Sequence, residues 1–144
     1  MMLQLKEVLK RSIVDLSLSK AVPGCSPAAS VEEATKLLQG AAGTCILVLD
    51  QKKAVGIFTE RDVLKKVTLS GVDAKATPVS KLMTPNPVSV TRQASVGDVL
   101  MKMKDGKFRH LVVADAYGNS EGVVSMRDIT DYLANLVIQD HANP

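Results

Sequence analysis

The sequence predicts an α/β (α+β) fold in which two βαββα repeats pack sheet to sheet with pseudo-two-fold symmetry. Three observations support this class: an internal repeat, the same succession of strand-like and helix-like apolar patterns in each copy, and a polar break between the copies. A single unit of roughly 55 residues buries too little surface to be stable alone, so the copies are expected to pack together. The chain has 144 residues, of which 46% are hydrophobic, and this is enough for a core.

The repeat is visible as matching segments. Ala29-Ser30-Val31 recurs as Ala94-Ser95-Val96 after 65 residues, and Gly56–Asp62 recurs as Gly122–Asp128 after 66 residues. The extra residue falls within 116–121, where a turn tolerates a change of length. We therefore place the first repeat at 12–69 and the second at 79–138, joined by a polar linker at 70–78 that contains glycine and proline.

Each repeat is expected to run strand, helix, strand, strand, helix. The strands are placed at 21–25, 45–49 and 55–58 in the first copy and at 87–90, 111–114 and 122–124 in the second. The first helix of each copy follows Ser30 or Ser95, and the last begins at Thr59 or Ser125. A short helical lead-in is expected at 79–83, before the second copy.

At the four expected helix starts, a hydroxyl residue is followed three positions later by a carboxyl residue, which is the spacing of a capping box: Ser30/Glu33, Ser95/Asp98, Thr59/Asp62 and Ser125/Asp128. The last two pairs also follow a buried strand and a glycine. A helix start offers unpaired N–H groups that suit phosphate, and a carboxylate there can accept hydrogen bonds from both ribose hydroxyls. The other interpretation, a plain helix cap that contributes about 1 kcal/mol, stays open for both pairs.

The repeated Gly-x-x-Thr/Ser-x-x-Asp element, the strand Phe108–Val113 and the entry segment Met83–Pro87 together resemble the CBS domain, a family named for cystathionine β-synthase. The pair resembles a tandem CBS module, often called a Bateman module, over about residues 12–136. The resemblance implies that AMP, ADP, ATP or S-adenosylmethionine binds in clefts between the repeats, and that the modules pair into flat dimers.

The resemblance also implies which residues surround the ligand. The first site would use Thr59 and Asp62, with Asn86, Pro87 and Val88 around adenine and Arg109, His110 and Arg127 at the phosphate. The second site would use Ser125 and Asp128, with Ala21, Val22 and Pro23 around the base and Arg61 near the phosphate.

The two sites are predicted to differ in strength. Thr44 and Cys45 stand where the second copy has Arg109 and His110, and neither can replace a cation at a phosphate. We therefore expect the Asp62 site to bind the phosphorylated nucleotide. The Asp128 site is expected to be weaker, or to prefer a ligand with less negative charge.

The leading functional prediction is a non-catalytic regulatory module that senses an adenosine-type small molecule and signals to an unknown partner protein. The alternative is a ligand-free structural module for dimerisation or interaction. An enzyme is disfavoured, because the sequence has no Ser-His-Asp or Cys-His set and no P-loop. Neither a metal nor a required cofactor is expected, because the cysteines and histidines lack metal-site spacing.

Charge and hydropathy limit the partners. A net charge of +3, without a basic run interleaved with aromatics, does not indicate nucleic-acid binding. No apolar stretch reaches membrane-spanning length and the first residues do not form a signal peptide, so a cytoplasmic protein without membrane contact is expected. An apolar stripe on the two terminal helices could belong to the core, but the helix lengths suggest a surplus face, which we interpret as a homodimer contact with two-fold symmetry. The stripe consists of Val67, Ile129, Leu133, Leu136 and Val137.

Overall fold

A computed structural model describes residues 4–16, 22–40 and 45–142 of the chain. They fall into two compact units. One, here called the β1–β4 unit, comprises Ala21–Pro87 and Gly118–Ser120. The other, the β5–β7 unit, comprises Met1–Lys20, Val88–Tyr117 and Glu121–Pro144.

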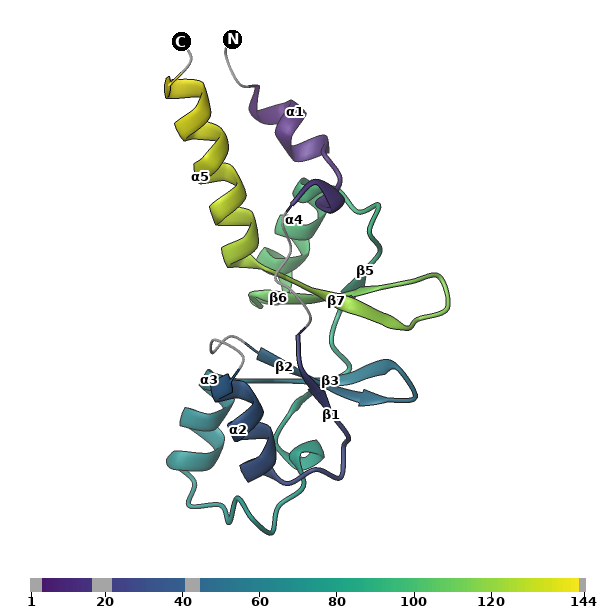
Figure 1. Cartoon of the computed structure of the whole chain (residues 1–144), viewed down its shortest axis with the longest axis vertical. Coiled ribbons are helices and arrows are strands. Elements are labelled where there is room, and N and C mark those ends of the chain that lie inside the picture. The colour runs from purple at the N-terminus through teal and green to yellow at the C-terminus, as the bar shows by residue number, and fades with distance from the viewer. Residues whose placement is uncertain (1–3, 17–21, 41–44, 143–144) are drawn as a thin grey trace. The chain divides into compact units, whose positions relative to one another are not determined.

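The β1–β4 unit holds a four-stranded sheet in the order β1-β2-β3-β4, with β1 parallel to β2 and the other pairs antiparallel. Its elements are β1 Gly24–Cys25, α2 Val31–Gly40, β2 Cys45–Asp50, β3 Lys53–Thr59, α3 Glu60–Asp62 with a π-helical continuation Val63–Thr68, a 3-10 turn Val79–Lys81, and β4 Thr84–Pro85 (Figure 1). Its core consists of apolar residues from α2, the central strands and the 3-10 turn: Val31, Ala34, Leu38, Ile46, Val48, Phe58 and Val79.

The β5–β7 unit holds a three-stranded sheet in the order β5-β6-β7, with its helices on one side (Figure 1). Its elements are α1 Leu5–Lys10, a 3-10 turn Ile13–Asp15, β5 Ser89–Val90, α4 Val96–Gly106, β6 His110–Ala114, β7 Ser120–Ser125 and α5 Met126–Ala142. Its core is Ile13, Leu16, Val90, Val96, Val99, Met103, Leu111, Val113, Val124 and Ile129. Gly97 lets α1 approach α4, since a Cβ there would lie 3.1 Å from the Leu9 carbonyl oxygen.

The sheet register repeats with the sequence. Gly24 pairs with Leu47 in the parallel strands β1 and β2, and the residues 65 positions later, Ser89 and Val112, pair in β5 and β6. The extra residue of the second copy lies in the turn between β6 and β7, where Gly118 has a φ of 85° that favours glycine. The predicted mixed fold of two related strand-and-helix units is therefore confirmed.

Each of the two 3-10 turns packs in one unit but is followed in the sequence by the first strand of the other unit. Ile13 precedes β1 in sequence, but its N–H donates to the Ala94 carbonyl at 2.9 Å and its side chain is fully buried in the core of the β5–β7 unit. Val79 precedes β5, but its N–H donates to the Ala29 carbonyl at 2.7 Å and it is fully buried in the β1–β4 unit. Each unit thus takes its 3-10 turn from the segment that leads into the other unit's first strand.

Two expectations need correction. The first strand of each copy is shorter than predicted, since β1 begins at Gly24 and β5 at Ser89; Ala21 lies outside the described residues. The prediction that Ile129 belongs to a dimer stripe is wrong, because Ile129 is 1% exposed and faces the core of its unit.

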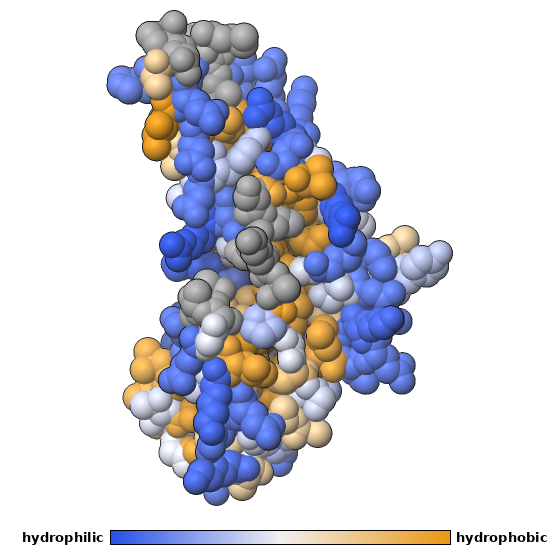
Figure 2. Space-filling view, in the orientation of Figure 1, coloured by the Kyte–Doolittle hydropathy of each residue, from blue (hydrophilic) through white to orange (hydrophobic). Residues whose placement is uncertain are grey.

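The rest of the proposed stripe is divided. Val67 and Leu133 are partly buried against their own cores, and Leu136 is also partly buried. Val137 remains exposed, and its neighbour Ile138 is exposed with it. Figure 2 shows hydrophobic side chains at the surface of the visible face, beside many hydrophilic ones. Within the described ranges, no helix combines the length and apolar character needed to cross a membrane.

Candidate functional site

The junction between β3 and α3 is a closed capping box. Thr59 has the extended backbone of an N-cap residue (φ −126°, ψ 168°), and its Oγ1 accepts a hydrogen bond from the Asp62 N–H at 3.3 Å. In return the Thr59 N–H donates to Asp62 Oδ2 at 2.9 Å. The preceding Phe58 is fully buried, so the strand holds this turn in place from the core. The junction therefore caps the helix as the plain structural interpretation requires.

The Asp62 carboxylate has further partners. Asp62 as a whole residue is 8% exposed, and its Oδ2 also accepts from the Thr59 hydroxyl at 3.2 Å. Oδ1 lies 3.0 Å from the Lys66 ammonium, which itself donates to the Leu82 carbonyl at 2.9 Å. A carboxylate this buried is stable when its charge is paired and hydrogen-bonded, and Lys66 supplies the opposite charge.

The junction between β7 and α5 repeats the box. The Ser125 N–H donates to Asp128 Oδ2 at 2.8 Å, and the Asp128 N–H donates to Ser125 Oγ at 3.1 Å. The Met126 N–H donates to the Arg109 carbonyl at 2.8 Å, so the first turn of α5 lies directly beside the residue that precedes β6. This places a cationic residue at the start of a helix of 17 residues.

His110 is the first residue of β6 and belongs to the same junction. Burial lowers the pKa of its imidazole, the nearby Asp128 carboxylate acts against that shift, and Arg109 adds to it. His110 is therefore within electrostatic reach of both charged groups. The structure brings Arg109, His110, Ser125 and Asp128 together, and such a cluster combines a hydrogen-bond acceptor for hydroxyls with cationic and imidazole donors.

The remaining predicted residues lie further away or face solvent. Asn86 adopts a left-handed backbone (φ 49°) and its N–H donates to the Val55 carbonyl at 3.0 Å. Val55 is four residues before Thr59 on β3, a separation of roughly 13 Å, so the structure does not bring Asn86 to Thr59 within the β1–β4 unit. Pro87 is half-buried next to it.

The residues expected around the bases form the entries to β1 and β5. The Leu47 N–H donates to the Pro23 carbonyl at 3.0 Å, and the Val112 N–H donates to the Val88 carbonyl at the same distance. Val22 is half-buried, whereas Ala21 and Thr44 lie outside the described residues.

The two helix arginines are exposed. Arg61 lies in α3. Arg127 lies in α5, with its Nε 3.9 Å from Asp131 Oδ2.

Lys66 is the site residue that the sequence analysis missed. Its spacing of four residues from Asp62 on a helix was the available signal, because side chains at that spacing are neighbours. The second copy has Tyr132 at the equivalent position, and its hydroxyl accepts a hydrogen bond from Arg11 Nη1 at 2.7 Å. The two junctions therefore differ in the residue that follows the carboxylate by one helical turn.

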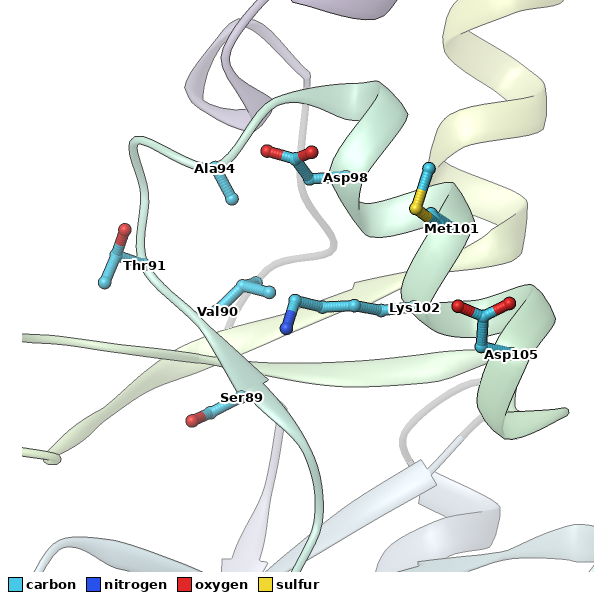
Figure 3. Close-up of a pocket in the computed structure, with 8 residues that line it drawn as sticks. All are labelled: Ser89, Val90, Thr91, Ala94, Asp98, Met101, Lys102 and Asp105. Carbon is cyan, nitrogen blue, oxygen red and sulfur yellow. The ribbon is translucent and has the colours of Figure 1, made fainter.

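A pocket of about 410 Å³ lies elsewhere, between β5 and α4 (Figure 3). Its charged residues Asp98, Lys102 and Asp105 come from α4, and Ser89 and Val90 come from β5. None of the predicted site residues lines it. Across the described ranges, no group of three or more His, Cys, Asp or Glu side chains is placed to hold a metal ion.

Comparison with known proteins gives matches over both repeats. The family model of the CBS domain matches residues 12–69 and 79–135. The CBS domain-containing protein CBSCBSPB3 of Arabidopsis thaliana is 30% identical over 112 residues, which are 78% of this chain and 20% of that protein. The chain thus spans about a fifth of the length of that curated relative.

Solved structures agree with the family match. A CBS-domain containing protein from Agrobacterium tumefaciens is 30% identical with a TM-score of 0.69, over 78% of this chain and 88% of that chain. The CBS domain pair of protein MJ0100, in complex with 5-methylthioadenosine and S-adenosyl-L-methionine, is 25% identical with a TM-score of 0.77, over 87% of this chain and 97% of that chain. These matches confirm the resemblance found in the sequence.

Proposed function

Because the chain belongs to the CBS-domain family and carries two copies of that domain, we propose that it is a non-catalytic module that binds an adenosine-containing ligand and signals its presence to a partner protein. The candidate ligands are AMP, ADP, ATP and S-adenosylmethionine. The CBS domain pair of MJ0100 supports this class, because both molecules in that complex contain adenosine. What all these ligands share is an adenine base and a ribose, so recognition has to begin there.

The observation that carries the proposal is the pair of equivalent carboxylates at strand-to-helix junctions. Asp62 and Asp128 each close a capping box at the end of a buried strand, at matching positions of the repeat. A carboxylate can accept hydrogen bonds from two neighbouring ribose hydroxyls. At the second junction the Arg109 carbonyl accepts from the first turn of α5, and His110 is within electrostatic reach of Asp128. The resemblance assigns Arg109 and His110 to the Asp62 site, and on that ground the Asp128 site is expected to be weaker. Because both residues lie beside Asp128 within the β5–β7 unit, which junction binds the phosphorylated nucleotide more tightly stays a prediction for calorimetry to test.

Calorimetric titration with AMP tests the proposal. Asp62→Ala and Asp128→Ala should each raise the Kd of one AMP-binding event by at least about tenfold or abolish that event, since a hydrogen bond to a charged group is worth about 1.5–3 kcal/mol. Glu33→Ala is the matched control, because Glu33 Oε2 accepts from the Ser30 N–H at 3.1 Å in a capping box that is not a proposed site. Glu33→Ala should lower the free energy of unfolding by a similar amount, about 1 kcal/mol, without changing the affinity for AMP. Equal effects of all three variants on affinity would contradict a binding role for the junctions.

A ligand-free structural module is the second candidate, and one observation favours it. Both capping boxes are complete within the protein, so neither junction needs a ligand to satisfy its hydrogen bonds. A thermal-shift screen with AMP, ADP, ATP, S-adenosylmethionine and NADH separates the two candidates. A ligand at a hundredfold excess over its Kd stabilises the native state by about 2.7 kcal/mol. An unchanged Tm with every compound would leave the structural module as the function.

A further inference from the structure

Lys66 lies on the π-helical continuation of α3, four residues after Asp62, and pairs with its carboxylate. Its ammonium is 3.0 Å from Asp62 Oδ1, and it donates to the Leu82 carbonyl at 2.9 Å. About 40% of its side chain is exposed, whereas the carboxylate side chain is 10% exposed. The ammonium therefore stands beside a nearly buried carboxylate, fixed by a second contact to the backbone of the segment before β4. The equivalent residue of the second copy, Tyr132, carries a phenol in place of the ammonium, so this ion pair is a property of the first junction.

The hydrogen bonds already made at Asp62 limit what a ligand can add. An ionised carboxylate has about four acceptor positions. Oδ2 accepts from the N–H and the hydroxyl of Thr59, and Oδ1 accepts from Lys66. One position is left for a ligand while Lys66 stays in place. A ribose with two neighbouring hydroxyls would donate to Asp62 only once, and the second hydroxyl would have to displace the ammonium.

We propose that Lys66 is a specificity-determining residue that makes the Asp62 junction tolerant of a ribose lacking one hydroxyl. The inference rests on the proposed function, since it concerns how adenosine ligands are read at that site. With Lys66 present, a ribose and a 2′-deoxyribose each make one hydrogen bond to Asp62 and bind almost equally. Without Lys66, the ribose makes two and the deoxyribose still makes one.

The test compares adenosine with 2′-deoxyadenosine by calorimetry, in an Asp128→Ala background that leaves only the first junction. Lys66→Met keeps the length of the side chain and removes the charge. It should raise the preference for adenosine over 2′-deoxyadenosine about tenfold, the factor given by one hydrogen bond of about 1.4 kcal/mol. Neither probe carries phosphate, so the loss of a positive charge near a phosphate does not enter the comparison.

Two control variants define the result. Lys36→Met removes the ammonium of another i,i+4 pair, in which Lys36 Nζ is 3.2 Å from Glu32 Oε1 on α2, and it should leave the preference unchanged. Lys66→Arg keeps the ion pair and should also leave it unchanged. If Asp128→Ala unfolds the chain, Asp128→Asn keeps the cap, because its side-chain oxygen can still accept from the Ser125 N–H, and a two-site fit of the titration then separates the first junction from the second.

The possible failures are distinguishable. If adenosine binds to the parent variant and Lys66→Met gives the same preference, the role of Lys66 is overturned while the proposed function stands. If neither the wild-type protein nor any variant binds adenosine, AMP or S-adenosylmethionine, the proposed function fails and this inference fails with it.

Discussion

Ile13→Ala should destabilise the β5–β7 unit even though Ile13 precedes the first repeat's strands in the chain. The side chain of Ile13 is fully buried in the core that includes Val96 and Val113. Truncating a buried isoleucine to alanine costs about 2–5 kcal/mol, depending on how far the cavity collapses. A loss of about 3 kcal/mol raises the local unfolding equilibrium constant roughly a hundredfold.

Native-state hydrogen exchange measures this effect residue by residue. In Ile13→Ala, the amides of β6, such as Val113, should exchange about a hundredfold faster, and those of β2, such as Val48, should change little. Val79→Ala should give the reverse pattern, because Val79 is fully buried in the β1–β4 unit. Val14→Ala is the control, since Val14 is adjacent to Ile13 and 60% exposed. Faster exchange in β2 but not in β6 for Ile13→Ala would refute the exchanged packing.

Three further predictions address the second junction and the surface. Burial lowers the pKa of His110, so below about pH 6.5 the unfolded chain binds more protons than the folded chain, and the contribution of neutral His110 to the free energy of unfolding is complete above that pH and is lost as the pH falls. In urea unfolding at pH 5.5 and 7.5, His110→Phe should therefore show a smaller change in stability between the two pH values than the wild type, and an equal change would contradict this role of His110. In calorimetry, Arg109→Ala should weaken the binding of AMP about tenfold and the binding of adenosine little, because only AMP carries a phosphate. Equal losses of affinity for the two ligands would exclude a phosphate contact. Val137→Asp, on the exposed part of α5, should convert the predicted homodimer to a monomer in light scattering, whereas an unchanged mass would remove Val137 from the dimer contact.

Features set by neighbours in sequence were predictable. The register of the parallel strands follows the 65-residue shift, since Gly24 with Leu47 and Ser89 with Val112 are the same pair in two copies. The capping boxes at Thr59 and Ser125 were also predictable, because their hydrogen bonds join residues three positions apart. Short-range geometry of this kind is encoded by residue type and spacing alone.

Features set by distant contacts were not predictable. Nothing in the local pattern around Ile13 indicates that its N–H donates to Ala94, because the chain could have folded back on its own repeat. The apolar spacing of α5 was visible, but it did not reveal that Ile129 faces the core while Val137 faces solvent. The contact of Lys66 with Asp62 followed from helical spacing, but its contact with Leu82 depends on tertiary packing.

Both capping boxes are complete within the protein, and this limits how firmly the proposed sites can hold a ligand. No buried side-chain nitrogen or oxygen in the described part of the chain lacks a hydrogen-bond partner, so a ligand at either proposed junction would satisfy no described buried group that is otherwise unpaired. A ribose hydroxyl that donates to one of these carboxylates gives up a hydrogen bond to water, and the net gain from such an exchange is small compared with that from satisfying a buried unpaired group. Under the proposed function, occupancy of a junction should therefore fall as readily as it rises with the ligand concentration, because each capping box is complete without the ligand.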